Sequence, residues 1–118
     1  MKYLILILFI SSAYAYAYAD NYTETNYCGK PARDINGVIK RDSKVPREYQ
    51  KIIPCPVTGL TTGTCTGWAK DHVRPLASCG CDSVSNMQWL PLSIKSCAGT
   101  ECKDRWERMV YVCKTVDR

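Results

Sequence analysis

The chain contains very little histidine. His72 is the single histidine among 118 residues, so a site built from several histidines is excluded. Histidine is the side chain that ordinarily gains or loses a proton near neutral pH, and enzymes use it there as a general base. His72 is therefore the natural candidate for such a base. The structural alternative is a partly buried histidine that only satisfies a hydrogen bond.

The chain also lacks the Cys-x-x-Cys pair on which zinc knuckles are built. An even number of cysteines in a small exported chain is typical of a disulfide framework, whose connectivity the sequence does not reveal. We expect up to four disulfides, with a zinc site as the rival interpretation. Because Cys79 and Cys81 are too close for an easy mutual bridge, we expect each to pair elsewhere. The eight cysteines are Cys28, Cys55, Cys65, Cys79, Cys81, Cys97, Cys102 and Cys113.

No apolar run is long enough to cross a membrane. The longest, from Leu4 to Ile10, is far shorter than the roughly 20 residues that a spanning helix needs. It follows Lys2 and precedes an Ala-Tyr alternation that ends at Ala19, which is typical of a secretory signal peptide over residues 1–19. We therefore expect a secreted or periplasmic protein.

The remaining residues, 20–118, contain no internal repeat and no sign of a second domain, so we expect one small domain. The formal charge of the whole chain is +5, and signal cleavage removes one positive charge with Lys2. A modestly basic domain is compatible with a polyanionic partner such as nucleic acid.

The hydrophobic pattern predicts several short elements. Residues 33–41 resemble a small hairpin, because Asn36-Gly37 favours the two-residue turn with positive φ at both central positions. A short helix is predicted from Ser43 towards Ile53. We expect its buried face to carry Val45, Tyr49, Ile52 and Ile53.

Two strands and a last helix are predicted further along the chain. Residues 68–73 and 86–90 have the composition of paired strands separated by an irregular loop. The final segment is predicted to be an amphipathic helix. Its apolar face would carry Cys102, Trp106, Met109, Val110 and Cys113, with Lys103, Asp104, Glu107 and Arg108 elsewhere.

Chemistry-bearing residues gather around the first of these strands. Asp71 directly precedes His72, and Asn86 follows fourteen residues later, just before Met87-Gln88-Trp89. Hydrolysis of a phosphodiester near neutral pH requires a base that titrates there and a way to neutralise the phosphate charge. Carboxylate and amide oxygens are the ligands that hard divalent cations select. These residues therefore point to phosphodiester hydrolysis.

The whole string from Asp71 to Trp89, DHVRPLASCGCDSVSNMQW, resembles the core of the HNH (His-Me finger) endonucleases. It is most similar to the small proteobacterial and phage members, whose core ends in a Lys-Asp-Arg-Trp-Glu-Arg segment like the one at residues 103–108. The resemblance covers roughly residues 33–108. It implies a small disulfide-rich α+β domain built around a ββα-metal core.

The resemblance also implies roles for individual residues. His72 would be the general base, and Asp71 would bind a divalent metal ion, Mg²⁺ or Mn²⁺. Asn86 would either bind the metal or hold the loop that orients His72. Because residues 90–101 offer no histidine or asparagine as a further ligand, the carboxylates of Asp104 and Glu107 are the candidates, with an exposed ion-pair lattice as the alternative. We retain Glu107.

Three arginines are candidates for phosphate binding: Arg74, Arg105 and Arg108. Phosphate contacts carry little base information, so we expect a metal-dependent endonuclease with low sequence specificity. The expected partner is nucleic acid, DNA in preference to RNA, and the sequence does not decide between the two. Two other functions stay open. One is a disulfide-stabilised binding or inhibitory module that kept the fold without catalysis. The other is an exported effector whose target is not nucleic acid. Oligomeric state is not predicted.

Overall fold

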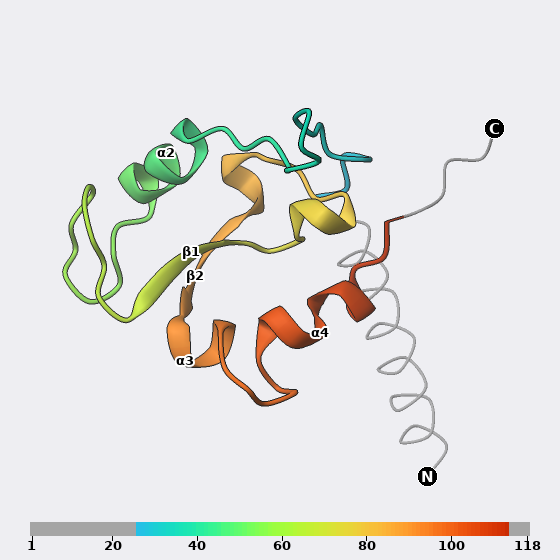
Figure 1. Ribbon diagram of the computed structural model, residues 1–118. Helices are drawn as coiled ribbons and strands as arrows, with labels where there is room; N and C mark the ends of the chain where they lie inside the picture. The colour runs from blue at the N-terminus through green and yellow to red at the C-terminus, as the bar shows by residue number, and fades with distance from the viewer. Residues whose placement is uncertain (1–25, 114–118) are drawn as a thin grey trace, which may run out of the picture.

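The computed structural model describes residues 26–113, so the predicted signal peptide and the first residues after it lie outside the described part. The described chain contains both helices and strands (Figure 1). Its elements are, in chain order, α2 (Lys44–Ile52), β1 (Trp68–His72), the 3₁₀ turns η1 (Leu76–Ser78) and η2 (Val84–Asn86), β2 (Met87–Pro91), α3 (Leu92–Lys95) and α4 (Lys103–Val110).

The two strands pair antiparallel, as their composition predicted. Trp68 lies opposite Pro91 and His72 lies opposite Met87, so the register runs the full length of both strands. The first strand was predicted over residues 68–73 and ends one residue earlier, and the second was predicted over residues 86–90 and lies one residue later. The connection between the strands is the irregular loop 73–86, which contains η1 and η2.

The two faces of the two-stranded sheet are covered by different helices and carry different kinds of side chain. In Figure 1, α2 lies on one side of β1 and β2, and α3 and α4 lie on the other. Side chains alternate across a strand, and here the alternation sends Met87 to the α2 side, where it packs with Val45 and Tyr49. Gln88, the next residue, instead donates a hydrogen bond to Asp71 Oδ2. One side of the sheet therefore carries an apolar cluster and the other a polar one.

Helix α2 was predicted at nearly the right place, but its exposed and buried faces were partly wrong. Val45 and Tyr49 are buried as expected, whereas Ile52 and Ile53 are 66% and 47% exposed. Gln50 is buried in their place, because its side chain donates to the Leu60 carbonyl. The helix also begins differently. Ser43 makes no side-chain cap, and the Asp42 carboxylate accepts the Lys44 N–H instead.

Helix α4 buries only part of the apolar face that the sequence predicted: Cys102 is buried and Trp106 is partly buried, as expected. Met109 is 73% exposed and Val110 is 48% exposed, whereas Lys103 is only 3% exposed. Lys103 points inwards because carboxylates from β1 and from α4 itself accept its hydrogens. The short helix is therefore held by ion pairs more than by its apolar residues.

The hairpin at residues 33–41 exists as a single bridge between Arg33 and Ile39, but its predicted turn is wrong. Gly37 N–H donates to Asp34 O, so Ile35 and Asn36 are the central residues, and of the residues in this turn only Gly37 has a positive φ. The reason is the Asp34 carboxylate, which accepts the N–H groups of Asn36 and Val38. This side chain shifts the turn by one residue.

All eight cysteines lie at bonding distance in four pairs, as the disulfide interpretation predicted. Cys79 and Cys81 pair with other cysteines, as expected. The pairs are Cys28–Cys81, Cys55–Cys65, Cys79–Cys113 and Cys97–Cys102. Such a framework is typical of proteins that fold in an oxidising compartment. Among residues 26–113, no helix has the length and apolar character needed to cross a membrane.

Candidate functional site

His72, the last residue of β1, is held by an acidic partner from the following loop. Its Nε2 lies 3.0 Å from Asp82 Oδ1, and the two side chains are 15% and 23% exposed. A carboxylate can only accept, so Nε2 carries the hydrogen of this bond. In a neutral imidazole the other nitrogen, Nδ1, is then the proton acceptor. The arrangement provides a base whose tautomer is set by Asp82.

Asp82 is itself fixed from a second direction. Its Oδ2 accepts the backbone N–H of Asp42 at 2.7 Å, so each carboxylate oxygen has its own donor. Partial burial alone would raise the pKa of Asp82. The Asp42 N–H, the hydrogen bond with His72 and the nearby charges of His72 and Arg41 together outweigh it, so the pKa of Asp82 lies below its ordinary value. Asp82 therefore stays a carboxylate at neutral pH.

His72 lines a cavity of about 290 Å³ between β1, the loop after it, α3 and α4. Four basic side chains share this cavity, against two acidic ones. The basic residues are Arg41, Lys70, Lys95 and Arg108, and the acidic ones are Asp71 and Glu107. The remaining walls are Pro75, Leu76 and Ala77. Excess positive charge beside a base suits an anionic ligand.

Asp71, the predicted metal ligand, is 6% exposed and makes ion pairs with two lysines. Its Oδ2 lies 2.9 Å from Lys103 Nζ and also accepts from Gln88, while its Oδ1 lies 3.5 Å from Lys95 Nζ. Lys95 is further held by Asp104 at 2.9 Å. Burial lowers the pKa of Lys95, but its bonds and charges with Asp104 and Asp71 outweigh this and raise it. Lys95 is therefore a fixed cation at the cavity.

Asn86 is fully buried and holds the loop that follows His72. Its Oδ1 accepts the Arg74 N–H at 2.9 Å, and its Nδ2 donates to the carbonyls of Arg74 and Cys81 at 2.9 and 2.7 Å. Both ends of its amide are thus used by the backbone. Of the two predicted roles, the contacts match the loop-holding one, which keeps Asp82 next to Cys81 within reach of His72.

The predicted phosphate-binding arginines lie in three different surroundings. Arg74 is 2% exposed, and its guanidinium donates to the carbonyls of Ser78 and Val112, so the structure does not bring it to the cavity. Arg108 does line the cavity. Arg105 is exposed on α4 and does not line this cavity.

The residues that the sequence proposed for a metal ion are already engaged by other groups of the chain. Asp71 and Glu107 each place one oxygen on Lys103 Nζ, at 2.9 and 2.7 Å, and the Asn86 amide is committed to backbone groups. A different group, Cys97, Glu101 and Cys102, lies close together, but both sulfurs belong to one disulfide. Neither set, as arranged, fits a divalent cation.

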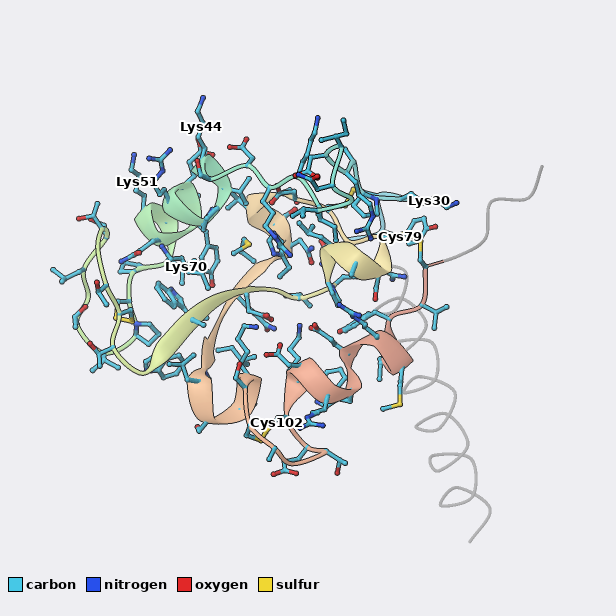
Figure 2. All side chains as sticks on the ribbon, viewed as in Figure 1. Lys30, Lys44, Lys51, Lys70, Cys79 and Cys102 are labelled. Atoms are coloured by element: carbon cyan, nitrogen blue, oxygen red, sulfur yellow. A yellow bond between two sulfur atoms is a disulfide. The ribbon has the colours of Figure 1, made fainter. Side chains whose placement is uncertain are left out.

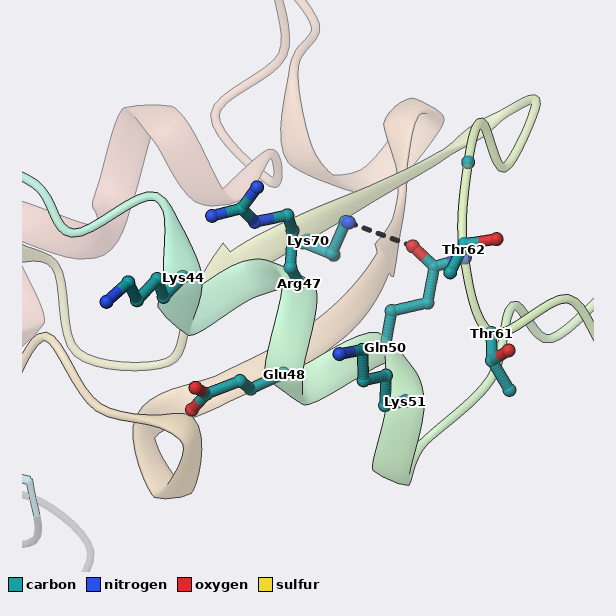
Figure 3. A pocket seen from close by; sticks show the side chains of 9 residues that line it. Lys44, Arg47, Glu48, Gln50, Lys51, Thr61, Thr62 and Lys70 are labelled. Carbon is teal, nitrogen blue, oxygen red and sulfur yellow. Dashed lines mark hydrogen bonds between the residues drawn. The ribbon is translucent and has the colours of Figure 1, made fainter.

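A second cavity of about 500 Å³ lies between α2 and the loop at residues 61–63 (Figure 3). We call it the α2 groove. It is lined by Lys44, Arg47, Lys51 and Lys70, with Glu48 as the one acidic residue, and by Gln50, Thr61, Thr62 and Gly63. Lys70 comes from β1 and donates to Gln50 Oε1 at 2.9 Å. Because Lys70 lines both cavities, the α2 groove and the His72 cavity adjoin.

Several of these residues carried no assigned role in the sequence. Asp82 lies inside the string that resembles the HNH core, and this position was the one feature of the sequence that could have marked it as a site residue. Lys103 likewise stands in the Lys-Asp-Arg-Trp-Glu-Arg segment. Arg41, Lys70 and Lys95 have no local signal at all, since isolated basic residues are common on any surface.

Comparison of the chain with protein-family models, with curated proteins and with solved structures finds no match.

Proposed function

We propose that this protein is a secreted HNH-type endonuclease that hydrolyses phosphodiester bonds of nucleic acid, preferably DNA, with low sequence specificity. The observation that carries the proposal is the His72–Asp82 pair in the wall of a cavity with four basic side chains. A fixed base beside a surplus of positive charge is what hydrolysis of a phosphodiester requires. The order β1, irregular loop, β2 and later α4 also fits the ββα arrangement of that family.

His72 acts in this proposal through Nδ1, the nitrogen that Asp82 leaves unprotonated. Nδ1 takes a proton from a water molecule as the water oxygen forms a bond to phosphorus. The bond from phosphorus to the leaving oxygen breaks, and that oxygen takes a proton from solvent. Negative charge grows on the phosphate during this step, and Lys95, Arg41 and Arg108 line the cavity where it grows.

The α2 groove extends the same positive surface. A nucleic-acid strand carries regularly spaced phosphates, so a continuous series of basic side chains is the surface that it fits. Lys70, shared by the two cavities, makes the series continuous from α2 to His72. Contacts of this kind bind the backbone and leave the bases unread, which supports low sequence specificity.

Secretion is the part of the proposal supported by the four disulfides, together with the signal peptide predicted over residues 1–19. The resemblance also predicts a requirement for Mg²⁺ or Mn²⁺. Since Lys103 holds one oxygen of Asp71 and one of Glu107, no step above is assigned to a metal ion.

The test is nicking of supercoiled plasmid by the oxidised, secreted protein, measured in chelator and again with Mg²⁺ or Mn²⁺. We expect His72→Ala to cut at least about a hundredfold more slowly, since it loses the general base. Circular dichroism and intact mass would show that the variant keeps its fold and its disulfides. Cleavage by the folded variant at the parental rate would refute the proposed mechanism. If the parent binds DNA and never cuts it under any of these conditions, the alternative function, a disulfide-stabilised binding module without catalysis, replaces the nuclease.

A further inference from the structure

Lys103 is the buried cation of the candidate site. It is 3% exposed, although it is the first residue of α4, where a positive charge is unfavourable next to the positive end of the helix dipole. Its ammonium group has three hydrogens to donate. The acceptors are Asp71 Oδ2 at 2.9 Å, Glu107 Oε2 at 2.7 Å and the His72 carbonyl at 2.9 Å. Every donor of the group is therefore used.

These acceptors are chemically a cation-binding set. Two carboxylates and a backbone carbonyl are oxygen ligands of the kind that hard divalent ions take. One of them, Asp71, is the residue that the resemblance to HNH enzymes assigns to the metal, and Glu107 is the carboxylate that the sequence offers where the usual helix ligand is missing. In this structure they converge on an ammonium nitrogen of the chain itself.

Displacing this ammonium group would be costly. Lys103 lies almost wholly out of solvent, and a buried charge that loses its partners is strongly destabilising. Lys95 adds a second positive charge 3.5 Å from Asp71 Oδ1, which repels any approaching cation. Gln88 also donates to Asp71, so both oxygens of this carboxylate already have hydrogen-bonding or charged partners.

We propose that the Lys103 ammonium is the resident cation of this site, held where the HNH resemblance would place a divalent metal ion. Lys103 is a positioning residue: it fixes Asp71, Glu107 and the His72 backbone, while Lys95, Arg41, Lys70 and Arg108 face the cavity. This deepens the proposed nuclease function and rests on it only for the identity of the ligand in the cavity. It replaces the expected metal requirement with catalysis that persists in chelator.

The test uses Mn²⁺, which is paramagnetic, and the single histidine, which contributes one set of imidazole NMR signals. Wild-type protein, stripped of metal and titrated with one equivalent of Mn²⁺, should keep sharp His72 signals. In Lys103→Ala the carboxylates of Asp71 and Glu107 lose their ammonium partner and become available as ligands. We expect this variant to bind about one Mn²⁺ and to lose its His72 signals by broadening.

Two matched variants sharpen the result. Lys95→Ala removes a more exposed cation from Asp71 but leaves Lys103 on both carboxylates, so this variant should not gain a stoichiometric Mn²⁺ site. Asp71→Asn combined with Lys103→Ala should abolish the binding gained by Lys103→Ala. The proposal is wrong if the wild-type protein binds Mn²⁺, the His72 signals broaden, and Asp71→Asn prevents both the binding and the broadening. This comparison does not depend on the folding of any Lys103 variant. It is also wrong if folded Lys103→Ala binds no Mn²⁺. None of these readouts uses nucleic acid, so failure of the proposed function leaves them interpretable.

Discussion

Replacing Asp82 with asparagine should inactivate His72 as a general base, although the histidine itself is still present. Asp82 Oδ2 accepts the Asp42 N–H at 2.7 Å, and Oδ1 accepts from His72 Nε2 at 3.0 Å. In the variant the amide oxygen must stay on Asp42, because an NH₂ group cannot accept a hydrogen bond. The amide nitrogen then faces Nε2 and donates to it. His72 would switch tautomer, so that Nδ1 carries the hydrogen and no longer accepts one from water.

The size of the effect follows from the role of the base. Loss of general base catalysis lowers a rate by about 10²–10⁴-fold, which corresponds to about 3–5 kcal/mol in the activation barrier. Asp82→Ala should be less harmful than Asp82→Asn, because alanine offers no donor to turn the imidazole around. A merely structural carboxylate would give the opposite order, since asparagine keeps the size and the bond to Asp42.

Two measurements check this prediction, one with and one without catalysis. Plasmid nicking gives the rates of the two variants, with Asp34→Asn as a control, since that carboxylate accepts the N–H groups of Asn36 and Val38 and lines neither the His72 cavity nor the α2 groove. Ring-nitrogen NMR of the one histidine reports the tautomer directly. We expect hydrogen on Nε2 in wild type and on Nδ1 in Asp82→Asn. A neutral His72 with its hydrogen on Nδ1 in wild type would refute the reasoning.

Two further predictions concern the basic surface and the acid range. Lys44→Gln with Lys51→Gln in the α2 groove should weaken DNA binding and reduce its salt slope by about two. Lys30→Gln with Lys40→Gln should leave the slope unchanged, because neither lysine lines the α2 groove or the His72 cavity. Figure 2 shows Lys30 on a different part of the molecule from Lys44 and Lys51. Equal slopes in the two double variants would contradict the role of the groove. For Asp104, burial raises the pKa, but the hydrogen bonds of Lys95 and Ser96 and the lysine charges outweigh it and lower the value. Its contribution to stability should be present at pH 7 and should decrease as the pH falls below about 4, so the difference between the urea midpoints of wild type and Asp104→Asn should shrink on acidification. A difference that grows on acidification would contradict this sign.

Local pattern was enough to predict part of this protein. The strands at residues 68–72 and 87–91 were predicted because composition and turn residues over a few positions decide them. The lone histidine identified the candidate base, because no other side chain of the sequence ordinarily titrates near neutral pH. The even cysteine count and the absence of Cys-x-x-Cys predicted disulfides, which depend on compartment and number more than on geometry.

Tertiary structure decided what depends on residues far apart in the chain. Cys28 pairs with Cys81 across 53 positions, and no spacing rule could choose that partner. Lys103 meets Asp71 because α4 packs near β1, and this contact buries a lysine that the sequence had placed outside the buried face of α4. Helical periodicity shows where apolar residues recur. It does not show that an ammonium group with three oxygen partners can be buried in preference to some of those apolar residues. The pairing of His72 with Asp82 likewise required the loop that Asn86 holds in place.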